Sequence, residues 1–461
     1  ANVLASWRRM DTLICRETYG SKSDPRDYLC KNDGTISESR SGNRGLSSIL
    51  HFLRVVFLPQ GYPDSVSKDY LEYQIWDTVQ AFSSSITGTL STHAMLKGVG
   101  VGDESASAAA ATITWLLRDG TSMTGRIAFA WYQGSSLDSD AKRWRLFADI
   151  MNDAAMCIEL ISVFFPQYFV IIACVSSLFK SMVGVAGGAT RAALTMHQAR
   201  RNNMADVSAK DGSQETLVNL AALFVGLIIT PIASKNILLT WSLFFLCTCL
   251  HLYANYRAVT CVVMETLNQN RFHILVQDYL HSSHFSMSGP DAVNSREPVV
   301  WRLSRPLKLN LGVPFRTVAK SMRDIEMCLQ SNGQEKFLLS LDVKKGCIDI
   351  VIHHDSTSED FIKACLQAEI IMYTTFHLHD NRAHGDNLSR ELTDILERGV
   401  YMNRDDAWQA VKVSGQICNK LFPRFLHDLG QAGWVKGHSQ LGADEWRATW
   451  NISGVDARKV F

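Results

Sequence analysis

The chain has 461 residues, 46% of them hydrophobic, and its 46 Lys and Arg against 45 Asp and Glu leave a formal charge of +1. This length predicts two to three domains, and a charge near zero argues against a polyanion such as nucleic acid as partner. The eleven cysteines are scattered without a C-x-x-C pair, which predicts reduced thiols, and the tail histidines form no metal-ligand pattern, so we expect no metal and no cofactor.

The N-terminal region, residues 1–45, is predicted to be a flexible segment. Ser21 to Arg44 is rich in Ser, Asp, Asn, Lys and Gly, a composition that cannot bury a core. Leu46 to Leu58 then has the pattern of an amphipathic helix that ends before Pro59. This helix could lie on a membrane surface or pack in a core.

Six membrane-spanning helices are predicted next, within residues 46–265. A spanning helix needs roughly 20 mostly apolar residues, and Leu217–Ala233 contains no Asp, Glu, Lys or Arg. Pro166 and Gln167 interrupt another uncharged run, which predicts the tip of a helical hairpin. The expected spans are Thr78–Leu96, Ser105–Trp131, Leu146–Phe165, Phe169–Ala189, Leu217–Ala233 and Ile237–Val259.

Basic residues in the connections predict which side of the membrane each one faces. Most lie after the second and fourth spans, as Lys142, Arg143, Arg145, Arg191, Arg200, Arg201 and Lys210. The alternate connections hold only Lys97 and Lys235. Because Lys and Arg accumulate in cytosolic connections, we expect an integral membrane protein with both termini in the cytosol. The organelle is not indicated.

Residues 266–461 are predicted to form a cytosolic α+β domain. Phe337–Val343 and Cys347–His353 flank a short turn with Gly346, which is typical of a β-hairpin. Further expected elements are strands at Val299–Leu303 and Glu445–Trp450, a helix at Ser358–Tyr373, and a helix at Asp405–Ala432 that is broken near Pro423.

Several sequence runs resemble the root UVB-sensitive family. The longest is F-L-P-Q-G-Y-P-D-S-V-S-K-D-Y-L-E-Y-Q-I-W-D, from Phe57 to Asp77. Others are S-S-S-I-T-G-T-L-S-T from Ser83, L-K-G-V-G-V-G-D from Leu96, W-L-L-R-D-G from Trp115, L-D-S-D-A-K-R-W-R from Leu137, V-A-G-G-A-T-R-A-A from Val185 and A-D-V-S-A-K from Ala205. The resemblance covers roughly residues 46–271.

This resemblance implies a membrane-associated protein without a known catalysed reaction. Plant members of the family are linked to vitamin B6 homeostasis, ultraviolet-sensitive root growth and auxin transport. They are thought to act in plastids and to associate with one another, which implies that this chain forms a homo-oligomer or pairs with a related family member.

Ionisable residues inside the predicted spans are the candidate site residues, because buried charge in a membrane is costly. Arg118 lies about 20 Å along the second span if that helix is continuous, next to Asp119, and Arg126 follows seven residues later. These residues could gate a pathway, bind a charged solute, or form a structural ion pair between helices.

Two further spans carry charges at helical spacing. Asp149 and Asp153 continue a stripe that starts at Arg145, and Lys180 and Arg191 project to one side of the next span. Carboxylates and cations on neighbouring helices could neutralise one another, or they could form a proton or anion pathway. Gly184 and Gly188 form G-x-x-x-G, which favours close helix packing.

The predicted topology resembles one half of a major-facilitator transporter, which pairs two six-helix halves around a central site. The first hypothesis is therefore a homo-oligomeric or partner-assembled carrier of a small charged solute. The alternative is a membrane-anchored adaptor whose cytosolic domain binds a partner protein. An enzyme with a Schiff base on Lys180 is the third choice, and we do not expect catalysis.

Overall fold

The computed structural model describes residues 12–17, 26–30, 35–40, 46–101, 107–282, 284–300, 305–332, 335–378, 387–442 and 446–450. The chain forms two compact units. The first comprises Ala1–Arg118, Asp153–Ser176 and Arg191–Ala258, and the second comprises Asp119–Asn152, Ser177–Thr190 and Val259–Phe461. The division between these units runs through four of the long helices described below.

Strands occupy part of the N-terminal region that the sequence predicts to be flexible. They are β1 (Thr12–Glu17), β2 (Arg26–Cys30) and β3 (Ile36–Arg40), and they pair antiparallel in the order β1-β2-β3. Arg16 bonds Asp27 across β1 and β2 at 2.7 Å. Leu13, Ile14 and Ile36 are exposed, so backbone pairing and cross-strand contacts define this small sheet, which has no apolar core of its own.

Seven helices follow among the described residues, and each contains most of a predicted helix, although α2 and α6 begin 8 and 13 residues earlier and α5 ends 9 residues later than predicted. They are α1 (Leu46–Phe57), α2 (Tyr70–Val99), α3 (Ala108–Gln133), α4 (Ala141–Ile161), α5 (Phe169–Gln198), α6 (Met204–Ala233) and α7 (Ile237–Cys261). Short 3-10 turns at Ser162–Phe164 and Pro166–Tyr168 separate α4 from α5. The hairpin tip predicted from Pro166 is therefore confirmed.

Three helical segments are long and apolar enough to cross a membrane. They are Pro166–Gln198, Met204–Ala233 and Ile237–Cys261. The other helices of the predicted bundle are formed, but α2, α3 and α4 are not among these candidates. Six long helices are therefore present, whereas the six-span transporter-like bundle is not confirmed. The polar side chains along α2 explain the difference, because they lower its mean hydropathy while leaving it helical.

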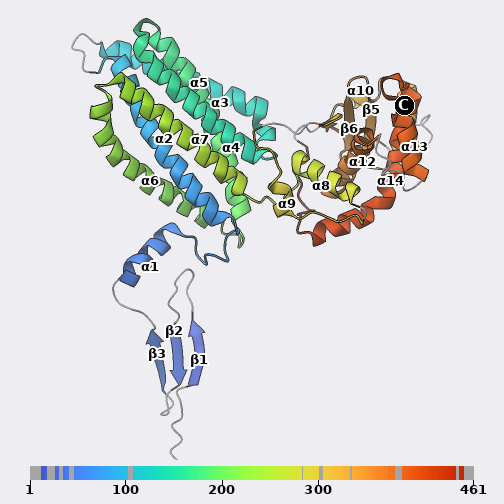
Figure 1. Cartoon of the computed structure of the whole chain (residues 1–461), viewed down its shortest axis with the longest axis horizontal. Helices are drawn as coiled ribbons and strands as arrows, with labels where there is room; N and C mark the ends of the chain where they lie inside the picture. The colour runs from blue at the N-terminus through green and yellow to red at the C-terminus, as the bar shows by residue number, and fades with distance from the viewer. Residues whose placement is uncertain are drawn as a thin grey trace, which may run out of the picture. The chain divides into compact units, whose positions relative to one another are not determined.

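The first unit has an apolar outside and a partly polar inside. In Figure 1, α2, α6 and α7 run side by side, and only 17% of the apolar window of α6 or α7 is buried. Leu227 and Ile228 on α6 and Leu246 on α7 are among the large exposed side chains. A hydrocarbon environment would cover such a surface without cost.

The second unit contains a small mixed sheet. Its strands are β4 (Lys308–Leu311), β5 (Phe337–Asp342), β6 (Cys347–His353) and β7 (Arg447–Ala448). β5 and β6 form the predicted antiparallel hairpin, with Gly346 at φ 64° in its turn, while β4 and β7 pair parallel to β6. β7 lies inside the predicted strand Glu445–Trp450. The predicted strand Val299–Leu303 lies mostly outside the described residues.

Helices pack around this sheet and complete an α+β domain. They are α8 (Gln269–His281), α9 (Pro290–Asn294), α10 (Phe315–Val318), α11 (Met322–Asn332), α12 (Ser358–Phe376), α13 (Asn387–Leu396) and α14 (Arg404–Gln431). The predicted break at Pro423 is wrong, because α14 continues through it. Phe425 and Leu429, which follow Pro423, are buried in the main core, and this packing offsets the lost backbone hydrogen bond.

Candidate functional site

A buried polar triad in the first unit joins α2, α4 and α7. Nδ1 of His251 lies 2.8 Å from Oδ2 of Asp153, and Nε2 of His251 lies 3.0 Å from Oε1 of Gln80. All three residues are buried. Asp153 is one of the predicted site residues, whereas His251 and Gln80 are not.

The hydrogen bonds of the triad define the protonation state of His251. The Nε2 amide of Gln80 donates to Asp77 at 3.1 Å, so the Gln80 oxygen faces the imidazole. Both ring nitrogens of His251 therefore face acceptors, and only an imidazolium, with two N–H donors, satisfies both. The triad thus fits a protonated imidazole on α7, a candidate membrane span, beside the carboxylate of Asp153 on α4.

A second buried carboxylate lies further along α4. Glu159 accepts a hydrogen bond from Ser176 on α5 at 2.7 Å and another from Ser91 on α2, and it is 1% exposed. Ser91 and Gln80 are eleven residues apart on α2, which puts them on the same face of that helix. The inward faces of α2 and α4 therefore carry a row of polar groups.

Arg191 on α5 pairs with α6. Its guanidinium lies 2.7 Å from Asp211 and 2.6 Å from Glu215, and Asp211 also accepts a hydrogen bond from Gln74 at 3.2 Å. Sequence spacing suggested that carboxylates of the third span could neutralise the cations of the fourth. The neutralising carboxylates of Arg191 instead come from the N-terminal turns of α6, which are helical although they lie before the predicted span Leu217–Ala233.

The remaining predicted charged residues lie on α3, α4 and α5. Arg118 is half-buried with its guanidinium 4.5 Å from the ring centroid of Trp115. Asp119 and Arg126 are exposed on α3, and Asp149 and Lys180 are half-buried.

The predicted packing glycines are not where helices approach most closely. Gly184 and Gly188 are exposed, and a Cβ at Gly188 would meet no described atom within 4 Å. Close approaches occur at Gly98 on α2, where a Cβ would lie 2.2 Å from the ring of Phe169, and at Gly125 on α3, where a Cβ would lie 2.4 Å from Oγ of Ser181. Gly125 followed no recognised small-residue spacing and was not predicted.

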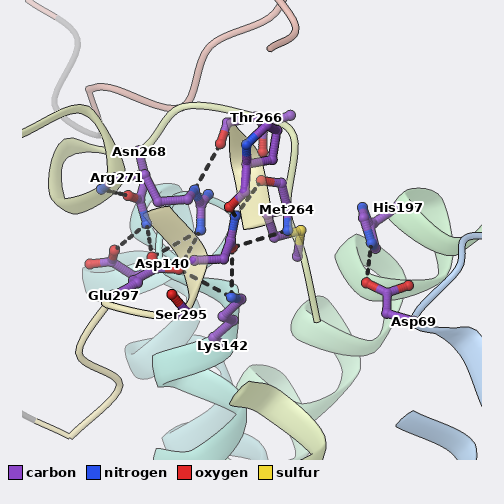
Figure 2. Close-up of polar contacts among 12 residues, drawn as sticks. Asp69, Asp140, Lys142, His197, Met264, Thr266, Asn268, Arg271, Ser295 and Glu297 are labelled. Carbon is purple, nitrogen blue, oxygen red and sulfur yellow. Dashed lines mark hydrogen bonds and ion pairs between the residues drawn. The ribbon is translucent and has the colours of Figure 1, made fainter. Parts of the chain in front are cut away.

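The long sequence run Phe57–Asp77 packs against the C-terminal end of α5. Asp69 accepts from Nε2 of His197 at 2.9 Å, as Figure 2 shows, and both side chains are almost buried. The backbone N–H of Ser67 donates to the carbonyl of Gln198 at 2.9 Å. The backbone N–H of Gln60 also donates to Asp206 at 2.7 Å, which joins two of the runs that carry the family resemblance, those from Phe57 and from Ala205.

A buried ionic cluster organises the second unit (Figure 2). Glu297 lies 2.9 Å from the guanidinium of Arg271 and 3.2 Å from Nζ of Lys142. The three side chains are 3–5% exposed. Asn268 donates to Glu297 at 2.8 Å and also caps α8 by accepting from the backbone of Arg271. Asn294 accepts from Lys142 at 2.7 Å.

The cluster keeps Glu297 ionised. Burial by itself would raise the pKa of this carboxyl, but Arg271 and Lys142 outweigh it and lower the pKa from 4.5 to about 2. Lys142, which the sequence analysis treats as a loop charge, is thus a buried structural residue at the start of α4. A charge count along the chain cannot reveal this, because its partner is more than 150 residues away.

Comparison with known proteins identifies the family. Residues 43–283 match the family profile described as "Vitamin B6 photo-protection and homoeostasis domain", and residues 286–450 match "Root UVB sensitive protein, C-terminal". The chain belongs to the root UVB-sensitive family.

Relatives from a plant and an amoeba support this assignment. The chain is 36% identical to Protein root UVB sensitive 3 of Arabidopsis thaliana over 441 residues, or 92% of each chain. It is 46% identical to RUS family member 1 of Dictyostelium discoideum over 277 residues, 59% of this chain and 52% of that one. The names of these root UVB-sensitive relatives carry no enzyme activity. No solved structure gives a significant match.

Proposed function

We propose that this root UVB-sensitive protein is a membrane carrier of a small charged solute, contributes to vitamin B6 homeostasis, and works as a homo-oligomer or with a related family member. The observation that carries the proposal is the triad of Asp153, His251 and Gln80. Charged groups within a membrane are costly to bury, and where they occur they commonly mark a solute or proton pathway.

Protonation gives this triad two distinct states. Loss of one proton from His251 would leave its contact with Gln80 or Asp153 without a donor, so the helices α2, α4 and α7 would be held together less firmly. We infer that the solute moves together with protons. Glu159 would extend the polar path, and Arg118, Asp119, Arg126, Asp149 and Lys180 are candidates for gating it.

The membrane topology belongs to the same proposal. Both termini lie in the cytosol if α2 to α7 all cross the bilayer, which requires α2, α3 and α4 to be shielded from lipid by neighbouring helices or a second copy. Single cysteines introduced into the connections of a chain without reactive thiols, labelled from either side, would test this arrangement. Opposite labelling of the two ends would contradict it.

The decisive experiment is uptake into proteoliposomes under a proton gradient, with pyridoxal 5′-phosphate and pyridoxamine as the probes. The double variant Asp153→Asn, His251→Gln keeps side-chain size and hydrogen bonding but removes both charges, and uptake should fall at least roughly ten-fold. Asp405→Asn, which alters an exposed ion pair of α14, is the control. Equal uptake by the wild type and the double variant would refute the triad's role.

The adaptor hypothesis is supported by the separate, well-packed C-terminal domain, which has its own family match. Deletion of this domain is not a clean test, because it would remove Glu297 and Arg271 and leave Lys142 without its counter-ion. Point variants on the exposed surface of the domain avoid this problem. If such variants abolish the cellular function while uptake is unchanged, the adaptor role is favoured.

A further inference from the structure

A cavity of about 590 Å³ lies in the C-terminal domain, away from the residues discussed above. It is formed mainly by α8 and α12. Imidazoles of His273, His281 and His377 line it together with Asp278, and Pro306, Met372 and Phe376 supply apolar wall. No Lys or Arg is among the described residues that line it. Its volume is in the range of small-molecule sites.

In two of the imidazoles, those of His273 and His377, the nitrogen that remains available to a ligand is Nε2. Nδ1 of His273 lies 2.7 Å from the carboxylate of Glu369, and Nδ1 of His377 lies 3.0 Å from the backbone carbonyl of Tyr373. Both partners are acceptors, so each Nδ1 carries the proton. In the neutral ring Nε2 is then an acceptor with a free lone pair.

The surroundings of these rings are acidic. Glu369 is 1% exposed, accepts a second hydrogen bond from Gln277, and its other oxygen, Oε1, has no hydrogen-bond partner among the described residues. Asp278 is held by Arg296 and Ser288. The hydrogen bonds and charge of Arg296 outweigh burial and keep the pKa of Asp278 below its ordinary value. A buried carboxylate favours a nearby positive charge.

We propose that this cavity binds a small organic cation, a primary ammonium group on an aromatic or apolar body. An ammonium group has three donors and no acceptor, and it matches the lone pairs of the Nε2 atoms of His273 and His377. The apolar body packs on Met372 and Phe376. An anion would meet lone pairs and carboxylates, and is excluded by the same groups.

The residues around the cavity suit a metal ion less well than an organic cation. The described part of the chain contains no group of three or more His, Cys, Asp or Glu residues placed to hold one. The rings also have other contacts: the centroids of Tyr373 and His377 are 4.2 Å apart, and those of His281 and His377 are 5.8 Å apart. These stacked rings offer an aromatic surface beside the Nε2 acceptor atoms. Such a surface suits an ammonium group that is carried on an aromatic body.

The test uses three probes that share a benzyl or phenyl body and differ in charge: benzylamine, benzyl alcohol and benzoate. Each is titrated calorimetrically into the purified full-length protein in detergent. We expect benzylamine to bind most tightly and benzoate least. His377→Phe should weaken benzylamine binding roughly ten-fold, the value of one hydrogen bond to a charged group. Glu369→Gln, which removes the negative charge behind His273, should weaken it as well.

His377→Phe keeps the ring that packs on Tyr373, so it tests the acceptor without removing the contact. Asp405→Asn serves as the control, because Asp405 is exposed on α14 and does not line the cavity. Binding of benzylamine that does not saturate, equal or tighter binding of benzoate, or unchanged affinity in His377→Phe would each overturn the proposal. None of these outcomes bears on the carrier proposal, which rests on the first unit.

Discussion

Replacement of Glu297 by Gln should destabilise the second unit strongly. The substitution keeps the size of the side chain and an oxygen that can accept from Asn268, but it removes the negative charge between Lys142 and Arg271. Two buried cations, 5% and 3% exposed, would then face each other without a counter-ion. Removing one partner of a buried ion pair costs about 3–5 kcal/mol.

The pKa of Glu297 gives a second estimate of the same quantity. A fall from 4.5 to about 2 corresponds to roughly 3 kcal/mol of preference for the ionised form. The two estimates agree in size, and the burial of all three residues means that solvent screening reduces them little. For a domain of this size, such a loss lowers the unfolding temperature by on the order of 10 °C.

Thermal unfolding of the purified protein in detergent, followed by tryptophan fluorescence, would measure this change. Trp434 is buried in the core of the second unit and reports on it. Asp405→Asn is the control, because its ion pair with Arg323 is mostly exposed and contributes at most about 1 kcal/mol. A second substitution, Lys142→Met, should restore part of the stability lost in Glu297→Gln. Equal unfolding temperatures for Glu297→Gln and Asp405→Asn would refute the reasoning.

Three further predictions concern the same unit. The pKa of Glu297 in the folded protein lies below 4.5, so the stabilisation that Glu297 contributes is complete above pH 4.5 and is lost as the pH falls toward 2. Between pH 7 and pH 3, the denaturation midpoint should therefore fall less in Glu297→Gln than in the wild type. Thr357→Ala removes the capping box that Thr357 and Asp360 form at α12 and should cost about 1 kcal/mol in chemical denaturation, whereas Thr357→Ser should not. Gly125→Ala should destabilise the protein by about 1–3 kcal/mol, because the added methyl group clashes with Ser181. Gly120→Ala is the control and should be neutral or stabilising, because a Cβ there meets nothing within 4 Å. Equal effects of the two substitutions would show that the helix contact at Gly125 is unimportant.

Much of the secondary structure could be predicted, because it depends on neighbours in the sequence. The apolar run of α7, the tip at Pro166 and the β5–β6 hairpin around Gly346 are all encoded within about twenty residues. The predicted helix break at Pro423 is wrong because it rests on local preference alone. A proline disfavours a helix, but the packing of the core around Phe425 outweighs that preference.

The candidate site was less accessible to prediction. Asp153 was chosen because it is a charge in a predicted span, and it does belong to the triad. Its partner His251 is 98 residues away, and a lone histidine in an apolar helix gives no local signal. Asp119 and Arg126 were chosen by the same rule, but they lie on the exposed side of α3.

The sequence alone therefore determined where the helices and the hairpin form and to which family the chain is similar, since periodicity, turn residues and motifs are local properties. Tertiary structure decided which charges are buried together. Lys142 and Glu297, or Asp153 and His251, stabilise each other only after distant segments have packed and excluded water. Their energies depend on that exclusion, and no pattern along the chain encodes it.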